Sequence, residues 1–110
     1  MNILNKIKMI DEHMIQTFIN DLSKWSDSAF GKERPFTAPL HHLKLEIDEV
    51  IESDGDPEEF ADCFLLLLDS YRKTGGNTQK LMQQMYKKLE INKQREWNKP
   101  TENGVFLHKK

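Results

Sequence analysis

Two pairs of acidic side chains are the groups in this sequence best suited to chemistry. Glu46 and Glu49 are three residues apart, and so are Glu59 and Asp62. At roughly 100° per residue, the two members of each pair lie on one side of a helix. Residues 53–56 are typical of a short turn, which would pack the two helices antiparallel. The four carboxylates can then converge on one point.

Carboxylates held this close repel one another unless a cation joins them. Oxygen ligands suit magnesium, calcium or manganese, and magnesium usually leaves positions for water and for substrate phosphates. The four acids are therefore predicted to hold a metal ion beside a phosphate-bearing substrate, with magnesium preferred and manganese as a substitute. The predicted ligands are Glu46, Glu49, Glu59 and Asp62.

A simpler interpretation exists for each acid alone, because Glu and Asp are common on exposed helix faces. Glu59 stands where a capping-box glutamate would, and Glu46 could pair with a lysine on its own helix. Asp62 is harder to explain in this way, because it directly precedes the apolar run 63–68. A buried carboxylate without a partner is costly, so a metal ion or a positive side chain is expected beside it.

A second group of polar residues lies near the end of the last predicted helix. The apolar stripe of that helix gives way to Lys88, Asn92 and Arg95, which lie within about 40° of the same direction. Lys and Arg bind phosphate and Asn can bind a base or a sugar hydroxyl, so these three are candidate substrate contacts. The alternative is a helix end that emerges into solvent. Trp25 could stack on a base, although such an aromatic residue is also typical of a core or a rim.

Four helices are predicted to position these residues. Apolar residues recur at three- and four-residue steps and no stretch alternates with period two, which indicates an all-α fold. The predicted helices span residues 10–24, 39–52, 57–75, and from 77 or 78 to 97. Asp56 is predicted to cap the third helix, and Pro57 suits its first turn.

The third predicted helix is apolar on every side over residues 63–68. A chain of 110 residues can hardly bury such a helix alone, so we expect at least a dimer, with the core completed by oligomerisation. We expect a single domain over residues 1–110, in which 98–110 form a polar tail that is mobile or laid across a surface. Cys63 is the only cysteine, so an intrachain disulfide is excluded, and it is interpreted as a buried apolar residue.

The charge and hydropathy of the chain limit the classes of partner. The formal net charge is -2, which gives no overall attraction to nucleic acid or to an anionic membrane. No apolar run is long enough for a signal peptide or a membrane span. A cytoplasmic protein with no nucleic-acid or membrane partner is therefore expected.

The spacing Glu46-x-x-Glu49 and Glu59-x-x-Asp62 resembles the paired motif of the MazG-like all-α nucleotide pyrophosphohydrolases. A longer string resembles the dATP/dGTP diphosphohydrolase branch of that family, and the resemblance covers nearly the whole chain from Phe18 onward. The string consists of Trp25, Phe30-Gly31, Arg34, His42-Leu43, Lys88, Asn92, Arg95, Trp97, Pro100, Gly104 and His108.

The resemblance implies a four-helix bundle that assembles as a homodimer or homotetramer. It implies hydrolysis of a (deoxy)nucleoside triphosphate, dATP or dGTP in the first place, to the monophosphate and pyrophosphate. The four acids would be the magnesium ligands. The nucleotide contacts would be Lys88, Asn92 and Arg95.

Under this hypothesis one carboxylate orients the attacking water. Glu49 is the first candidate because it lies farthest from the apolar stripe of its helix, and Glu46 is the second. Two alternatives stay open. One is a pyrophosphohydrolase for another nucleotide, such as dUTP, dCTP or a damaged deoxynucleotide. The other is a non-catalytic helical interaction module in which the acidic cluster is a binding surface.

Overall fold

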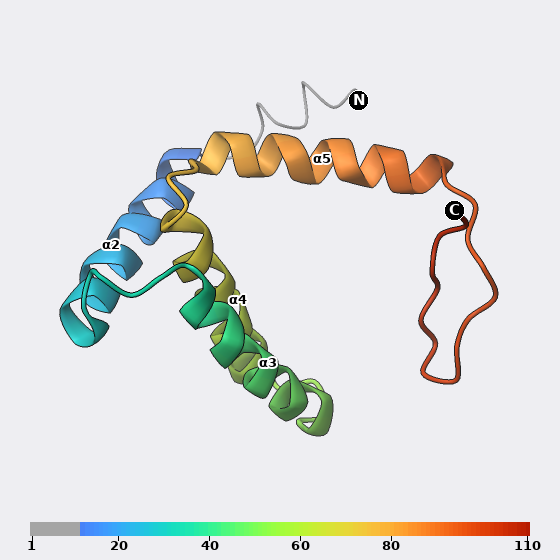
Figure 1. Ribbon diagram of the computed structural model, residues 1–110, viewed down its shortest axis with the longest axis horizontal. Helices are drawn as coiled ribbons and strands as arrows, with labels where there is room; N and C mark the ends of the chain where they lie inside the picture. The colour runs from blue at the N-terminus through green and yellow to red at the C-terminus, as the bar shows by residue number, and fades with distance from the viewer. Residues whose placement is uncertain (1–11) are drawn as a thin grey trace. The chain divides into compact units, whose positions relative to one another are not determined.

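The computed structural model describes residues 12–110, which form four α-helices and no strand (Figure 1). This confirms the predicted all-α class. The predicted start of the first helix at residue 10 lies outside the described residues. The helices are α2 (Glu12–Phe30), α3 (Thr37–Glu52), α4 (Pro57–Arg72) and α5 (Thr78–Gln94).

The described chain divides into two compact units, one ending at Thr78 and the other beginning at Gln79. The first contains α2, α3 and α4, and the second contains nearly all of α5 together with the C-terminal segment. The single domain expected over residues 1–110 stays a prediction. No helix within residues 12–110 is long and apolar enough to cross a membrane.

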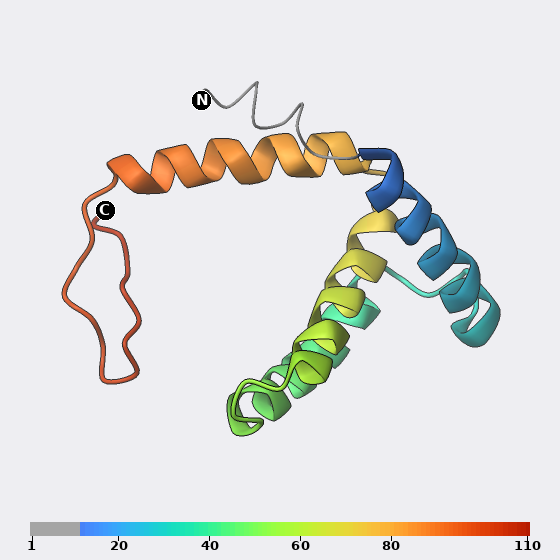
Figure 2. The same ribbon diagram turned by 180° about the vertical axis from the view of Figure 1, so that it is seen from behind.

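The helices α3 and α4 form an antiparallel hairpin, and they lie side by side from the turn upward (Figure 2). In the turn, Asp54 and Gly55 have positive φ angles of 57° and 84°, which glycine adopts without strain and aspartate tolerates. Asp56 then accepts a hydrogen bond of 3.0 Å from the backbone N–H of Glu58, and Pro57 occupies the first turn of α4. The predicted cap of α4 is therefore confirmed.

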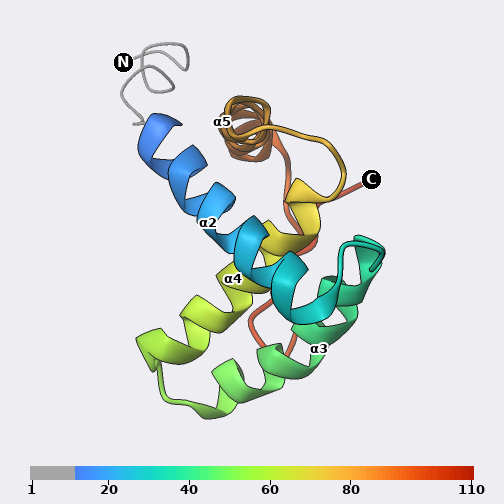
Figure 3. The same cartoon turned by 90° about the vertical axis from the view of Figure 1, so that its left-hand side faces the viewer.

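The helix α2 is longer than the sequence pattern predicted. It was expected to end before Trp25, but it continues to Phe30 and stops where Gly31, with φ of 91°, donates to the carbonyl of Asp27. No residue between Trp25 and Phe30 breaks a helix, and Ser26 in this stretch is fully buried against α4. Figure 3 shows α2 crossing α4 along this extension.

The apolar core of the single chain is small. Within the described residues, Ile19 and Leu22 of α2 are the buried apolar side chains apart from Pro39. One side of α4 stays open, because Phe60, Phe64 and Leu67 recur at helical spacing and the Phe64 side chain is 63% exposed. Within the unit that contains α2, α3 and α4, the side of α4 formed by Phe60, Phe64 and Leu67 is therefore uncovered.

The C-terminal segment closes on itself after α5, which ends at Gln94 rather than near residue 97. The Asn98 N–H donates to the Leu107 carbonyl, and the Lys109 N–H donates to the Glu96 carbonyl, both at 2.8 Å. An antiparallel bridge joins Trp97 to His108 at the base of this loop. The segment expected to be a polar tail thus has internal backbone hydrogen bonds.

Candidate active site

Three of the four predicted metal ligands meet where α3 and α4 face each other. Glu46 and Glu49 of α3 and Glu59 of α4 each offer one carboxylate oxygen, and these oxygens all lie within 4.8 Å of one another. Glu46 and Glu59 are half-buried, whereas Glu49 is exposed. The short turn places them together, because Glu49 lies one turn before the end of α3 and Glu59 lies in the first turn of α4. We call these three residues the acid triad.

Asp62 is not part of the acid triad, although it lies one helical turn after Glu59. Its side chain is exposed, and together with Glu46 it lines a cavity beside the triad. Its negative charge still acts on Glu59, since it is among the groups that raise the pKa of that carboxyl. Whether Asp62 is a fourth ligand stays a prediction.

Glu59 is the member of the acid triad in the least favourable surroundings. Burial raises the pKa of the Glu59 carboxyl above its ordinary value, and the negative charge of Glu49 raises this pKa further. One of its oxygens, Oε2, is buried and has no hydrogen-bond partner. The capping-box alternative is not adopted, because the Asp56 N–H donates instead to Ser53 Oγ at 3.3 Å. A buried oxygen without a partner, next to two further carboxylates, fits a divalent cation.

The third acid, Glu46, has a neighbour that holds its carboxylate. His42, one turn earlier on α3, places Nε2 3.0 Å from Glu46 Oε1. The sequence suggested a lysine as the partner of Glu46, but the structure gives it this histidine. A histidine hydrogen-bonded to a ligand carboxylate fixes the direction in which the remaining lone pairs point.

Cys63 lies close to these acids but is not poised as a nucleophile. The thiol is half-buried, and burial raises its pKa above the ordinary value. The negative charges of Glu46 and Asp62 raise this pKa further. A protonated thiol is a poor nucleophile and a poor metal ligand, which agrees with the interpretation of Cys63 as a packing residue.

A cavity of about 270 Å³ adjoins the acid triad. The helices α2 and α4 give it apolar and aromatic walls, and α3 and α4 bring carboxylates to it. Trp25, a predicted base-stacking residue, lines it with its side chain 59% exposed and makes an edge contact with Phe30 at 5.3 Å between ring centroids. The lining residues are Leu22, Trp25, Phe30, Arg34, His42, Glu46, Asp62, Leu65, Leu66 and Asp69. An aromatic wall near a cluster of carboxylates suits a ligand that has both a flat ring and phosphates.

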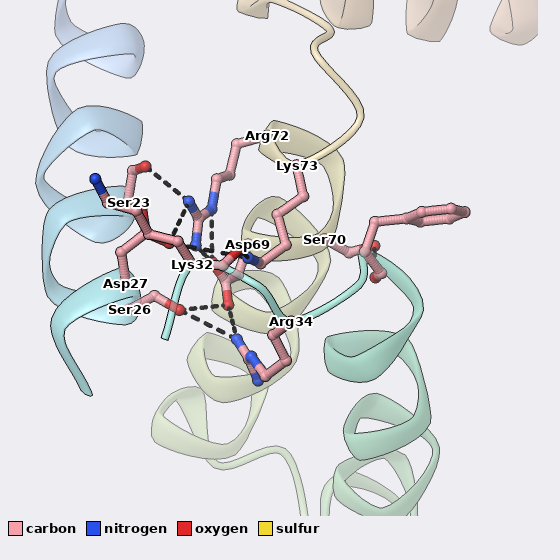
Figure 4. Close-up of polar contacts among 10 residues, drawn as sticks. Ser23, Ser26, Asp27, Lys32, Arg34, Asp69, Ser70, Arg72 and Lys73 are labelled. Atoms are coloured by element: carbon pink, nitrogen blue, oxygen red, sulfur yellow. Dashed lines mark hydrogen bonds and ion pairs between the residues drawn. The ribbon is translucent and has the colours of Figure 1, made fainter. Parts of the chain in front are cut away.

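A buried ionic network forms part of the wall of this cavity (Figure 4). Asp69, only 4% exposed, accepts hydrogen bonds from Ser26 Oγ at 2.8 Å and from Arg34 Nη2 at 2.9 Å. Arg72 lies 2.8 Å from the other oxygen of Asp69 and 2.9 Å from Asp27. Residue spacing alone did not reveal this network, because its members come from α2, the following loop and α4. One signal for this network was present in the sequence. Asp69 is an acid within an apolar helix, and such an acid requires a positively charged partner.

The three polar candidates belong to the other compact unit, with Lys88 and Asn92 on α5 and Arg95 directly after its end. Lys88 is exposed, whereas Asn92 and Arg95 are half-buried and joined by a 3.2 Å hydrogen bond from Arg95 Nη1 to Asn92 Oδ1. Lys88 and Asn92 also line a groove on α5 with Met85 and Leu89. The role of Lys88, Asn92 and Arg95 towards a nucleotide stays a prediction.

Known proteins resemble this chain in sequence and in fold. Residues 18–110 match the model of the dATP/dGTP pyrophosphohydrolase family. The Eaa protein of Salmonella phage P22 is 40% identical over 86 residues, which cover 78% of this chain and 27% of that protein. This chain therefore spans just over a quarter of the length of that curated relative. The cyanophage S-2L MazG-like pyrophosphohydrolase, solved with dGDP and three catalytic Mn²⁺ ions per active site, matches with a TM-score of 0.69 at 29% identity, over 84% of this chain and 93% of that one.

Proposed function

Because this chain belongs to the dATP/dGTP pyrophosphohydrolase family, we propose that it hydrolyses dATP or dGTP to the deoxynucleoside monophosphate and pyrophosphate. The observation that carries this proposal is the acid triad, in which carboxylates of α3 and α4 meet beside a cavity with an aromatic wall. The S-2L enzyme, which is similar in fold, holds dGDP and three catalytic Mn²⁺ ions in each active site. A site for divalent cations and a site for a flat base are the two features that this reaction needs.

The residues proposed to hold the metal ions are the acid triad, with Asp62 as the fourth ligand. Carboxylate oxygens match the preference of Mg²⁺ and Mn²⁺ for hard oxygen donors. When bound, such ions polarise phosphoryl oxygens and lower the pKa of a bound water. The support for Asp62 is its position one turn after Glu59 and its share in the wall of the same cavity as Glu46.

Within this proposal the side chains of the chain have separate tasks. Glu49 is exposed at the edge of the acid triad, so it can accept a hydrogen bond from water and orient it towards the α-phosphorus, with Glu46 as the second candidate. Trp25 offers its exposed ring face to the base. The charge that develops on the departing pyrophosphate is proposed to rest on Lys88 and Arg95, and Asn92 is proposed to bind the base or the sugar.

We also propose that the active form contains at least two chains, as a dimer or a tetramer. The apolar side of α4 formed by Phe60, Phe64 and Leu67 is exposed in the unit that contains α2, α3 and α4, and proteins rarely leave such a continuous stripe in water. The cytoplasm is the proposed location, where nucleoside triphosphates are available.

A panel of nucleotides tests the proposed reaction. The protein is incubated with Mn²⁺ or Mg²⁺ and with each common dNTP and NTP in turn, and the products are separated by ion-exchange chromatography. Monophosphate and pyrophosphate are expected from dATP or dGTP, and EDTA is expected to stop their formation. If dUTP, dCTP or a ribonucleotide is the preferred substrate, the assignment of the base is wrong. If no nucleotide turns over and Mn²⁺ does not raise the melting temperature, the acid triad is not a catalytic metal site.

A further inference from the structure

Arg34 is fixed in the wall of the cavity by two buried groups. Its Nη2 donates to Asp69 Oδ2 at 2.9 Å and to Ser26 Oγ at 3.2 Å, and Ser26 is itself fully buried. The guanidinium carbon lies 4.9 Å from the centre of the Phe30 ring. These contacts fix the orientation of the guanidinium before any ligand arrives, and Figure 4 shows Arg34 joined to Asp69 and Ser26 from the loop before α3.

The same contacts leave part of the guanidinium free to bind a ligand. Nη2 is used by Asp69 and Ser26, whereas Nη1 makes no hydrogen bond with the residues that the structure describes, and Nε is buried without a partner. The Arg34 side chain is 25% exposed although Nε is buried, so Nη1 is the nitrogen available to a ligand. Arg34 thus presents the N–H groups of Nη1 to the cavity, and no side chain of the described residues satisfies them.

The unpaired N–H groups of Arg34 favour a ligand that accepts hydrogen bonds. Arg34 and Arg72 both contact Asp69, while Arg72 and, at 3.8 Å, Lys73 share Asp27. Glu46, Asp62 and Asp69 line the cavity together with Arg34, so this preference comes from the Arg34 donor itself and not from a surplus of positive charge. A ligand acceptor at this point satisfies the free donor, whereas a ligand N–H group pointing the same way leaves it without a partner.

The position of Arg34 identifies the part of a nucleotide that it meets. The aromatic side of the cavity is formed by Trp25 and Phe30, and Phe30 holds the guanidinium at this side. If the phosphates lie at the acid triad, the flat base lies along the aromatic wall and its edge reaches Arg34. Guanine offers the acceptors O6 and N7 at one edge, and arginine is the side chain that most often recognises this edge, whereas adenine has an amino group in place of O6.

We propose that Arg34 is a specificity-determining residue that reads the O6/N7 edge of guanine, with Asp69 and Ser26 as its positioning residues. The inference rests on the proposed function, because it places the base of the substrate in the cavity beside the acid triad. It follows that dGTP is the preferred substrate and that dATP is the poorer one.

The test measures kcat/KM for dGTP and for dATP in the full chain and in three variants. In Arg34→Gln, kcat/KM for dGTP is expected to fall about tenfold or more and that for dATP to change by less than about threefold, so the preference shrinks. Arg34→Lys is expected to behave like the glutamine variant, since lysine keeps the charge but has no second nitrogen that could stay bound to Asp69 and Ser26 while the first donates to the base. Lys32→Gln removes a positive charge two residues away, on an exposed side chain, and is expected to leave both values unchanged. Equal losses for dGTP and dATP, or full rescue by lysine, would show that Arg34 binds phosphate and would overturn the proposal.

Substrate analogues test the same idea in the unmodified protein. The triphosphate of deoxyinosine keeps O6 and N7 and is expected to be hydrolysed like dGTP, whereas the triphosphate of 2-aminopurine deoxyriboside lacks O6 and is expected to resemble dATP. Ser26→Ala removes one hydrogen bond to Arg34 and is expected to weaken the guanine preference while lowering dATP turnover little. Equal turnover of the two analogues contradicts the reading of O6.

Binding separates this inference from the proposed function. Calorimetry with dGDP and dADP needs no turnover and reports the base preference directly. If the chain binds dGDP more tightly than dADP but hydrolyses no nucleotide, the proposed reaction is refuted and the role of Arg34 is supported. If the chain hydrolyses dNTPs but binds both diphosphates equally, the reaction is supported and the role of Arg34 is refuted.

Discussion

Glu59 is held in a position that costs the metal-free chain stability. Its carboxyl is partly buried, its Oε2 lacks a hydrogen-bond partner, and two further acids of the triad surround it. Burial and the charge of Glu49 both raise the pKa of this carboxyl, which means that the ionised form is disfavoured there. Such strain is typical of a ligand that is arranged for a cation.

The first prediction replaces Glu59 with glutamine. Without metal, Glu59→Gln is expected to melt at a higher temperature than the unmodified chain, because the repulsion within the acid triad is reduced. The rise in melting temperature on adding Mn²⁺ is expected to become smaller, because one ligand is lost. Differential scanning fluorimetry with EDTA and with Mn²⁺ measures both changes. Glu58→Gln, on the neighbouring exposed residue, serves as the control, and a lower metal-free melting temperature for Glu59→Gln alone contradicts the prediction.

The second prediction concerns the water that attacks the nucleotide. Glu49→Gln is expected to lower kcat by about 10² to 10⁴, because a glutamine side chain is a much weaker acceptor for a reacting water. The circular dichroism spectrum is expected to stay unchanged, since Glu49 is exposed. Glu52→Gln, three residues later on α3 and outside the acid triad, should keep full activity. A fully active Glu49→Gln enzyme would remove Glu49 from this role and leave Glu46 as the candidate.

At the scale of the helix, the start of α4 controls where Glu59 stands. Asp56 accepts from the N–H of Glu58, and this cap fixes the first turn of α4, in which Glu59 lies. Asp56→Ala is predicted to lower the free energy of unfolding by about 1 kcal/mol, as is common for the loss of an aspartate cap. Urea unfolding followed by circular dichroism measures the change.

Asp54→Asn is the matched control for that variant. It also removes a carboxylate from the turn, but asparagine tolerates the positive φ of 57° at this position. The control is expected to unfold at the same urea concentration as the unmodified chain. An equal loss in both variants would mean that charge rather than capping is the cause.

The sequence predicted the helices well where their signals are local. The apolar stripes, Asp56 and Pro57 were enough to place α3, the turn and α4, and the three-residue spacings were enough to bring Glu46, Glu49 and Glu59 together. The predicted length of α2 was wrong because the last turns of this helix are stabilised by a tertiary contact. Ser26 is buried by a hydrogen bond to Asp69, 43 residues away, and no local pattern reports such a contact.

The position of Asp62 was harder to predict for a related reason. Helical spacing places Asp62 on the same side of α4 as Glu59, but it does not determine how close the Asp62 carboxylate comes to Glu46 and Glu49 of the other helix. The acid triad ends with Glu59, and Asp62 faces the neighbouring cavity. The contacts of Arg34 could not be predicted from residue spacing, because its partners Ser26 and Asp69 come from two different helices.

At the scale of the whole molecule, the open side of α4 predicts self-association. Phe64 is at the centre of this stripe, and its side chain is 63% exposed. Sedimentation velocity is expected to give at least twice the mass of one chain for the unmodified protein, and close to the single-chain mass for Phe64→Glu, because a buried glutamate at an apolar interface is costly. Phe106→Glu, on a side chain that is 55% exposed in the C-terminal loop, is the control and should keep the larger mass. A single-chain mass for the unmodified protein would refute the prediction.

The hairpin of α3 and α4 also has a consequence for how the protein folds. Its two helices are joined by the turn at residues 53–56, so the contacts that gather Glu46, Glu49 and Glu59 close a short loop of chain. Short loops lose little entropy on closure, and local contacts form early in folding. The acid triad is therefore expected to assemble before α2 docks, and if it binds metal ions as proposed, ions present during synthesis would act on the nascent chain as well as on the finished enzyme.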